Sequence, residues 1–107
     1  MSKETHYNKG MDLFTEDRLE QAIEQLNQAL EIDPDFGDAL HALAMTHYHA
    51  GDISKAIEIG ERFLKVEPDN VHAYTSLSML YNTKGFIQKA EEMAEQASKL
   101  SSGQGDI

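Results

Sequence analysis

Apolar residues recur every three or four positions along most of the chain, which is the spacing of one face of an amphipathic helix. The pattern is clearest in residues 19–32, where the apolar face is formed by Ala22, Ile23, Leu26, Ala29 and Leu30. Pro34 ends this helix, because proline disfavours the helical conformation in the residue before it. The same reasoning predicts six helices, near residues 4–15, 19–32, 38–50, 53–66, 71–84 and 87–100.

The stretch from Gly37 to Asn70 contains one complete unit, two such helices joined at Gly51-Asp52 and closed by Pro68. Pro34 stands 34 residues before Pro68, and Gly85 stands 34 residues after Gly51. The sequence therefore contains three repeats of this unit, at residues 3–36, 37–70 and 71–104. A period of this length is typical of a solenoid, in which each repeat covers the apolar face of its neighbour. We predict one all-α domain over residues 3–100, followed by a polar tail at 101–107.

Residues at matching positions of the three units resemble the tetratricopeptide repeat. Small residues stand where the two helices of a unit would touch, namely Gly10, Ala44 and Ser78 on the first helices and Ala22, Ala56 and Ala90 on the second. Leu43, Leu77, Tyr81, Gly51 and Gly85 match further positions of the family pattern. The resemblance covers nearly the whole chain. It implies six antiparallel helices in a right-handed superhelix, with the first helices lining a concave groove.

Three departures from the pattern carry information. His6 and Lys9 stand where the second unit has Leu40 and Leu43, so the first helix is predicted to have a polar outer face. At the other end the last helix has polar replacements too, with Glu91 in place of Ile23 and Ile57 and Ser98 in place of Leu30 and Leu64. In the middle, Gly60 and Phe63 exchange the large and small positions, which predicts either close packing at Gly60 or a reoriented Phe63.

Composition and charge narrow the functional class. The chain of 107 residues has a formal net charge of −10, which disfavours nucleic acids and anionic membranes as partners. It has no cysteine, which excludes disulfides and thiolate chemistry. The N-terminus lacks the apolar run of a signal peptide, and no stretch approaches the ~20 apolar residues of a membrane span. A cytoplasmic protein is expected. We find no Gly-rich phosphate loop and no recognisable nucleophile, so no enzymatic activity is expected.

The family's groove positions identify the candidate binding residues. Transferred to this sequence, these positions predict the following binding residues: Tyr7, Met11, Phe14, Asp38, His41, Met45, Tyr48, His49, His72, Met79 and Asn82. One methionine occupies the same position in each unit, and methionine adapts to irregular apolar ligands. We expect the groove to bind a peptide or helix of a partner protein, with apolar side chains and a basic residue to meet Glu4 or Asp38. A plainer reading is that these methionines and aromatic residues fill the inside of a tight superhelix as core.

The best-known ligand site of the family is the carboxylate clamp of heat-shock cochaperones. It requires Lys and Asn in the first repeat, Asn in the second, and Lys and Arg in the third. The corresponding residues here are Tyr7, Met11, Ala42, His72 and Ser76. Binding of an acidic C-terminus by this route is therefore disfavoured.

Two other functions remain open from the sequence. In the first, the groove or the 93–100 end packs against another copy, giving a homodimer or a larger self-associated structural protein. In the second, histidines and methionines hold a soft metal such as copper. No close His-x3-His pair supports a metal site, and no cofactor is expected. A milder role for the histidines is pH sensitivity, since histidine titrates near 6.5 when unperturbed.

Overall fold

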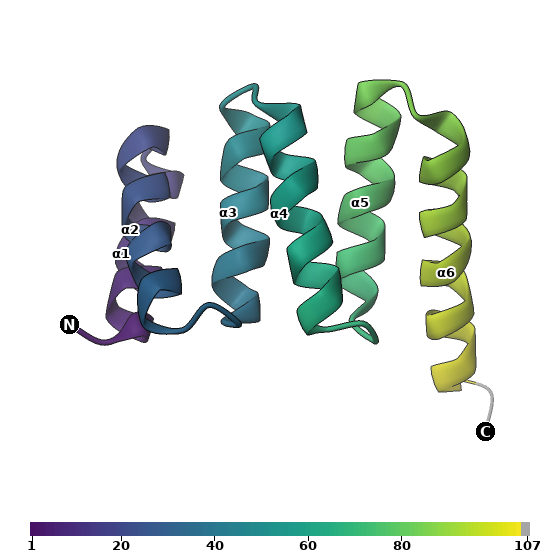
Figure 1. Cartoon of the computed structure of the whole chain (residues 1–107), viewed down its shortest axis with the longest axis horizontal. Coiled ribbons are helices and arrows are strands. Elements are labelled where there is room, and N and C mark those ends of the chain that lie inside the picture. The colour runs from purple at the N-terminus through teal and green to yellow at the C-terminus, as the bar shows by residue number, and fades with distance from the viewer. Residues whose placement is uncertain (106–107) are drawn as a thin grey trace.

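The computed structural model describes the backbone of residues 1–105 and the side chains of residues 1–103. It contains six helices, and no strand occurs in that part of the chain. The helices are α1 (Lys3–Thr15), α2 (Leu19–Ile32), α3 (Gly37–His49), α4 (Ile53–Val66), α5 (Val71–Lys84) and α6 (Ile87–Gly105). They stand side by side in chain order, and the two termini lie at opposite ends of the row (Figure 1). The predicted all-α solenoid is confirmed.

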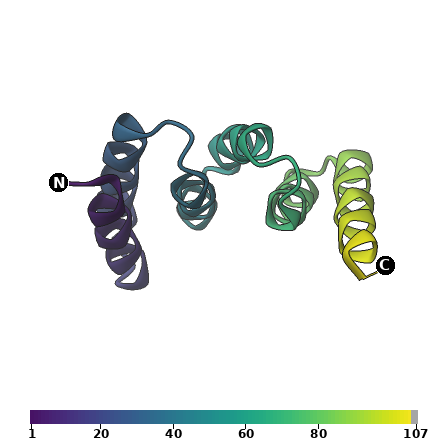
Figure 2. The ribbon, with the colours of Figure 1, turned by 90° about the horizontal axis from the view of Figure 1, so that it is seen from below.

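Each helix packs mainly on its neighbours in sequence. The contacts run α1 with α2, α2 with α3, α3 with α4, α4 with α5 and α5 with α6, and a smaller contact joins α1 to α3. Seen from below, α3 and α5 lie on one side of the row and α4 on the other (Figure 2). The molecule is accordingly a flattened slab of 41 × 33 × 21 Å. Its first helices form one face, which is where the sequence predicts the groove.

Local chemistry explains where the helices begin and end. Ser2 caps α1 by accepting a hydrogen bond from the Thr5 amide, and Asp52 and Asn70 cap α4 and α5 in the same manner. Gly85 ends α5 with φ of 91°, in the left-handed region that glycine enters without strain. The predicted bounds of α2, α4 and α5 agree with the structure. Helix α6, however, runs to Gly105, five residues beyond the predicted end, because Ser101 and Ser102 continue it. Residues 106–107 of the predicted tail lie outside the described residues.

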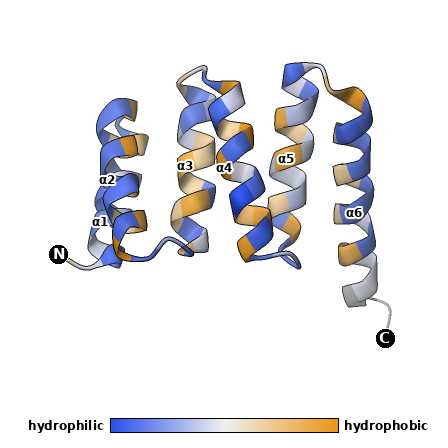
Figure 3. Ribbon diagram, in the orientation of Figure 1, coloured by the Kyte–Doolittle hydropathy of each residue, from blue (hydrophilic) through white to orange (hydrophobic). Residues whose placement is uncertain are grey.

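The buried apolar residues form two clusters, a larger one that runs from Leu26 on α2 to Ala73 on α5 and a smaller one of Leu77, Tyr81 and Ala90, and the half-buried Leu64 packs against both. The largest fully buried side chains are Leu26, Leu40, Leu43, Leu77 and Leu80. Gly10 lies so close to Leu26 that an added Cβ would come within 2.9 Å of it, which explains the small residue there. The predicted close packing at Gly60 is confirmed, since a Cβ there would lie 3.0 Å from Leu77, and Phe63 is buried. Figure 3 shows apolar residues along α3, α4 and α5 and a mostly hydrophilic α6.

Candidate functional site

A cavity of about 270 Å³ opens between α1 and α3 on the face of the first helices. Its walls are Tyr7, Met11 and Phe14 from α1, and Asp38, His41, Ala42, Met45 and His49 from α3. Successive members within each helix are three or four residues apart, so they share one face. The two helices contact each other only slightly, because each also packs on α2. The space between their exposed faces therefore stays open.

Aromatic contacts brace both ends of the cavity. At one end the Tyr7 ring packs on Phe36 with centroids 5.5 Å apart. At the other end Phe14 meets His49 edge to face at 5.2 Å, and Tyr48 also meets His49 edge to face at 5.2 Å. Such contacts restrict side-chain rotation, so less conformational entropy is lost when a ligand binds. The cavity is thus partly organised before binding.

Asp38 supplies the negative charge of the cavity. Its carboxylate is exposed at the rim, on the first turn of α3, where the helix dipole favours an acid. Burial raises the pKa of the neighbouring Tyr7 hydroxyl, and the charge of Asp38 raises it further. Tyr7 therefore remains a hydrogen-bond donor throughout the neutral range. Among the described residues, no Lys or Arg lines the cavity.

His41 forms the boundary between this cavity and α5. Its Nε2 lies 3.0 Å from the Ser76 hydroxyl, and its ring stacks on Phe63 at 5.2 Å. The His72 ring lies parallel to it on the α5 side at 6.1 Å. Burial lowers the pKa of His41, and the second histidine lowers it further. His41 is consequently held neutral to a lower pH than an exposed histidine.

Seven of the eleven nominated residues line the cavity, and four do not. Tyr48 is half-buried beside His49, and His72, which is on α5, lies next to His41 of α3. Met79 and Asn82 line a separate depression of about 280 Å³ between α5 and α6. The predicted groove face is therefore divided into two hollows. Ala42 is the lining residue missing from the nominated set, and its small side chain leaves room at the floor of the cavity.

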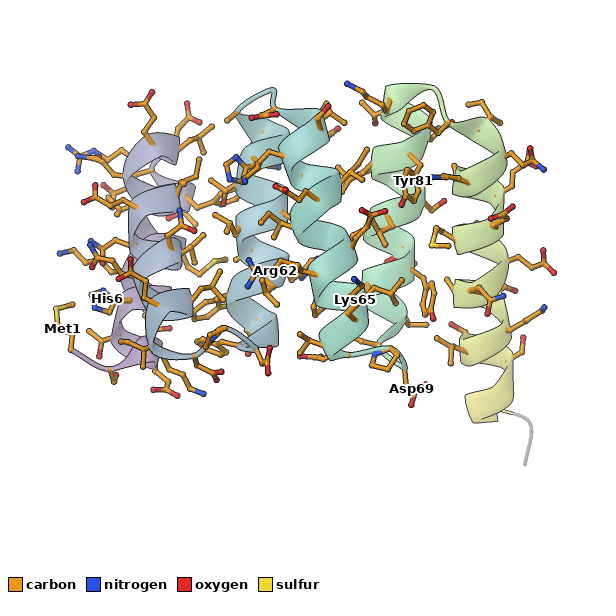
Figure 4. The ribbon with its side chains drawn as sticks, in the orientation of Figure 1. Met1, His6, Arg62, Lys65, Asp69 and Tyr81 are labelled. Atoms are coloured by element: carbon orange, nitrogen blue, oxygen red, sulfur yellow. The ribbon has the colours of Figure 1, made fainter. Side chains whose placement is uncertain are left out.

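Two basic residues, Arg62 and Lys65, lie away from the cavity on the second helix of repeat two. Figure 4 shows Arg62 and Lys65 on α4. Arg62 donates a hydrogen bond of 3.2 Å to the Pro34 carbonyl, across the junction between repeats one and two. Tyr81 on α5 donates a 2.5 Å hydrogen bond to Glu61 on α4. These polar contacts join neighbouring repeats and leave the cavity acidic.

The described residues offer no ready metal centre. None of the His, Asp and Glu side chains in that part of the chain form a group of three or more that could hold an ion. The thioethers of Met11 and Met45 are the only sulfur atoms in the cavity wall. Within the same residues, every helix is too short or too polar to cross a membrane.

Comparison with protein families decides the assignment. A model described as tetratricopeptide repeat matches residues 13–80, and a second model with the same description matches residues 71–104. The chain belongs to the tetratricopeptide repeat (TPR) family. A search of curated proteins gave no significant match.

Solved TPR structures superpose over nearly the whole chain. A crystal structure of MamA matches with a TM-score of 0.95 and 26% identity, covering 99% of this chain and 62% of MamA. This chain therefore spans less than two thirds of MamA. The second TPR of Spaghetti (RPAP3), bound to HSP90 peptide SRMEEVD, matches with a TM-score of 0.88 and 16% identity, covering 94% and 93% of the two chains. The Sgt2 TPR domain from Aspergillus fumigatus matches with a TM-score of 0.88 and 22% identity, covering 94% of this chain and 66% of that one.

Proposed function

We propose that this TPR domain is a protein-interaction module that binds a peptide or helix of a partner protein in the cavity between α1 and α3. The observation that carries the proposal is the lining of that cavity. Met11, Phe14 and Met45 give an apolar wall, and Asp38 stands at the rim as a negative charge without a basic neighbour in the lining. This combination suits an apolar anchor side chain followed by a lysine or arginine.

The size of the cavity favours a side chain over a cofactor. Small-molecule sites occupy ~300–1,000 Å³ and enclose most of the ligand. The volume here, about 270 Å³, lies just below that range, and the site is open along the face of the first helices. A peptide can lie across such an opening with one or two side chains inserted. Methionine adapts to anchors of different shape, which permits a family of related peptides.

The chemistry of the ligand differs from that of a related TPR structure. Spaghetti is bound to the peptide SRMEEVD, which is acidic at its C-terminal end. In this chain the positions corresponding to the clamp hold Tyr7, Met11, Ala42, His72 and Ser76, and the net charge is −10. An acidic peptide would meet no cationic partner at those positions and would be repelled by the overall field. We therefore propose apolar peptides of net positive charge as ligands.

A display library of short peptides, selected on the immobilised domain, tests this function. The selected sequences should combine a large apolar residue with a nearby Lys or Arg. Met45→Ala should weaken the best peptide about tenfold, because it removes roughly 1–2 kcal/mol of apolar contact from the cavity wall. Met79→Ala is the matched control, since Met79 holds the same repeat position but lies outside the cavity. Equal effects of the two substitutions would contradict binding between α1 and α3.

The charge requirement is tested separately. Asp38→Asn should weaken a lysine-containing peptide about threefold to tenfold and leave its norleucine analogue unchanged. Glu24→Gln on the exposed side of α2 makes the same change in net charge away from the cavity and should have little effect. Self-association is the alternative outcome. A dimer that persists on dilution in light scattering, and that Met45→Ala dissociates, would assign the cavity to a second copy.

A further inference from the structure

Repeat two differs from its neighbours at two positions that meet beside the cavity between α1 and α3. His41 stands where repeats one and three have tyrosine and threonine, and Phe63 stands where both have alanine. The two rings stack with centroids 5.2 Å apart and planes inclined by 18°. His41 also lines the cavity, so the stack holds an imidazole at a fixed place in the cavity wall. This contact is specific to repeat two.

Helix α5 supplies two further contacts to the ring of His41. The His72 ring lies nearly parallel to it with centroids 6.1 Å apart, and the Ser76 hydroxyl lies 3.0 Å from its Nε2. In the protonated form both ring nitrogens donate, so the hydroxyl accepts from Nε2 and this hydrogen bond is kept. Protonation of His41 therefore adds a positive charge to the cavity wall without breaking its contact with Ser76.

The groups that face His41 set the pH at which it takes up a proton. Burial lowers its pKa and the charge of His72 on α5 lowers it further, while Asp38 on α3 and Glu67 at the end of α4 oppose the shift. Tyr7 lines the opposite wall on α1 and stays uncharged in the neutral range, since burial and Asp38 raise its own pKa. His41 is thus neutral at about pH 7.5 and gains its charge below the ordinary histidine value of about 6.5.

Asp38 lies one helical turn from His41. The two residues are three positions apart on α3, so their side chains share one face, and both line the cavity. In the proposed function, on which the present inference rests, a lysine or arginine of the ligand meets Asp38. A cation in that place lies close to the charge that His41 gains. Because His41 is half-buried, water screens the repulsion between the two positive charges less than at an open surface.

We propose that the cavity holds a basic ligand at neutral pH and releases it on mild acidification, with protonation of His41 as the trigger. The added positive charge offsets the attraction of Asp38 for the lysine or arginine of the ligand. The coupling acts in both directions, so a bound cation in turn disfavours the proton on His41. Affinity is therefore constant while His41 is neutral, falls as the free protein takes up the proton, and levels off once His41 stays protonated with ligand bound.

A pair of small peptides tests the proposal. N-acetyl-Leu-Lys-amide has an apolar anchor and a lysine, and its analogue with norleucine in place of lysine has no charge. Binding is measured from the NMR signals of the Met11 and Met45 methyl groups, with Met79 as a signal outside the cavity. The dissociation constant of the lysine peptide should rise about threefold to tenfold between about pH 7.5 and 5, because the imidazolium repels its ammonium group. That of the norleucine peptide should change less than about twofold.

Three variants locate the trigger. His41→Gln should make binding of the lysine peptide independent of pH, because glutamine can hydrogen bond with Ser76 but does not titrate. His72→Gln should move the midpoint of the pH profile upward, because it removes a group that opposes the proton on His41. His49→Gln is the matched control and should keep the wild-type profile, since His49 lines the same cavity about three helical turns from Asp38.

The outcomes separate this inference from the proposed function. Affinity of the wild type that stays constant over the pH range, or a profile that survives His41→Gln, would overturn the trigger and leave peptide binding in the cavity intact. Loss of the profile in His49→Gln alone would overturn it as well. Absence of Met11 and Met45 shifts with both peptides at every pH would contradict the proposed function and the trigger together. Circular dichroism at each pH distinguishes loss of binding from loss of fold.

Discussion

The three repeats follow the same sequence pattern, but repeat two packs against a neighbouring repeat on both sides and repeats one and three on one side only. Helices α3 and α4 have a neighbour on each side, whereas α1–α2 and α5–α6 each have one open side. Leu43 and Leu77, which sit in the two internal junctions, are each 1% exposed. Lys9 holds the same repeat position in α1 and is exposed. A repeat position is therefore apolar where a neighbour covers it and is free to become charged where none does.

The two ends are also unlike each other. The outer side of α1 is polar along its length, with His6 hydrogen bonded to Gln25 through Nδ1 at 2.9 Å. The outer side of α6 combines the exposed Ile87 with Glu91 and Ala94. On α6 the positions of Ile57 and Leu64 are held by the exposed polar residues Glu91 and Ser98.

The largest effect is expected at the internal junction. Leu77→Ala should lower the free energy of unfolding by about 2–5 kcal/mol, because it leaves a cavity beside Gly60 and removes a fully buried side chain. Lys9→Ala at the same position of repeat one should change it by less than about 0.5 kcal/mol. Urea denaturation followed by circular dichroism measures both. Comparable losses for the two substitutions would show that α1 is covered in solution.

Most of the fold could be predicted from the sequence, because the three repeats share one pattern and equivalent positions can be compared. Pro34 and Pro68, and likewise Gly51 and Gly85, are 34 residues apart, so helix bounds inferred in one unit apply to the next. The predicted end of α6 at residue 100 was wrong, because the sequence has no proline there to match Pro34 and Pro68. Ser101 and Ser102 are polar but compatible with a helix, and α6 continues through them to Gly105. Polarity alone therefore did not mark the end of this helix.

The candidate site could be predicted only in part. Family positions nominate a face of each first helix, and on α1 and α3 that face lines one cavity. The family positions do not show that His41 on α3 contacts Ser76 and His72 on α5. Nor do they show that Met79 lines a separate depression between α5 and α6. The division depends on side-chain directions and on the placement of α5 next to α3. Spacing along the sequence contains neither. Whether the cavity binds a peptide stays a prediction.

The turns of the repeats provide a smaller test of the same comparison. Gly85 lies in the turn between α5 and α6 of the third repeat with φ of 91°, and Asp17 occupies the corresponding turn of the first repeat with φ of 62°. Gly85→Ala should cost about 1–2 kcal/mol, because a Cβ there meets nothing within 4 Å and the cost comes only from the left-handed backbone. Asp17→Gly should change stability by less than about 0.5 kcal/mol, since relief of strain is offset by greater freedom of the unfolded chain. Thermal unfolding of the two variants measures the difference. A harmless Gly85→Ala would mean that this turn adopts another conformation in solution.

The smallest effect concerns pH and the junction between α3 and α5. Burial lowers the pKa of His41, the nearby His72 lowers it further, and Asp38 and Glu67 oppose the shift. The unfolded chain restores a pKa of about 6.5, so below that pH the unfolded state binds more protons than the folded state. The contribution of His41 to stability is therefore complete above about pH 6.5, falls as the pH is lowered, and levels off below the folded pKa.

His41→Gln isolates this effect from the other titrating groups, which include His47, whose pKa burial also lowers. The variant keeps a side chain able to hydrogen bond with Ser76 but removes the titration. The difference in free energy of unfolding between wild type and variant should change as the pH falls from 7.5 to about 5, with the wild type losing more. His49→Gln is the control, because His49 is exposed beside the cavity. A difference that stays constant over this range for His41→Gln would show that α5 does not pack on the His41 ring in solution.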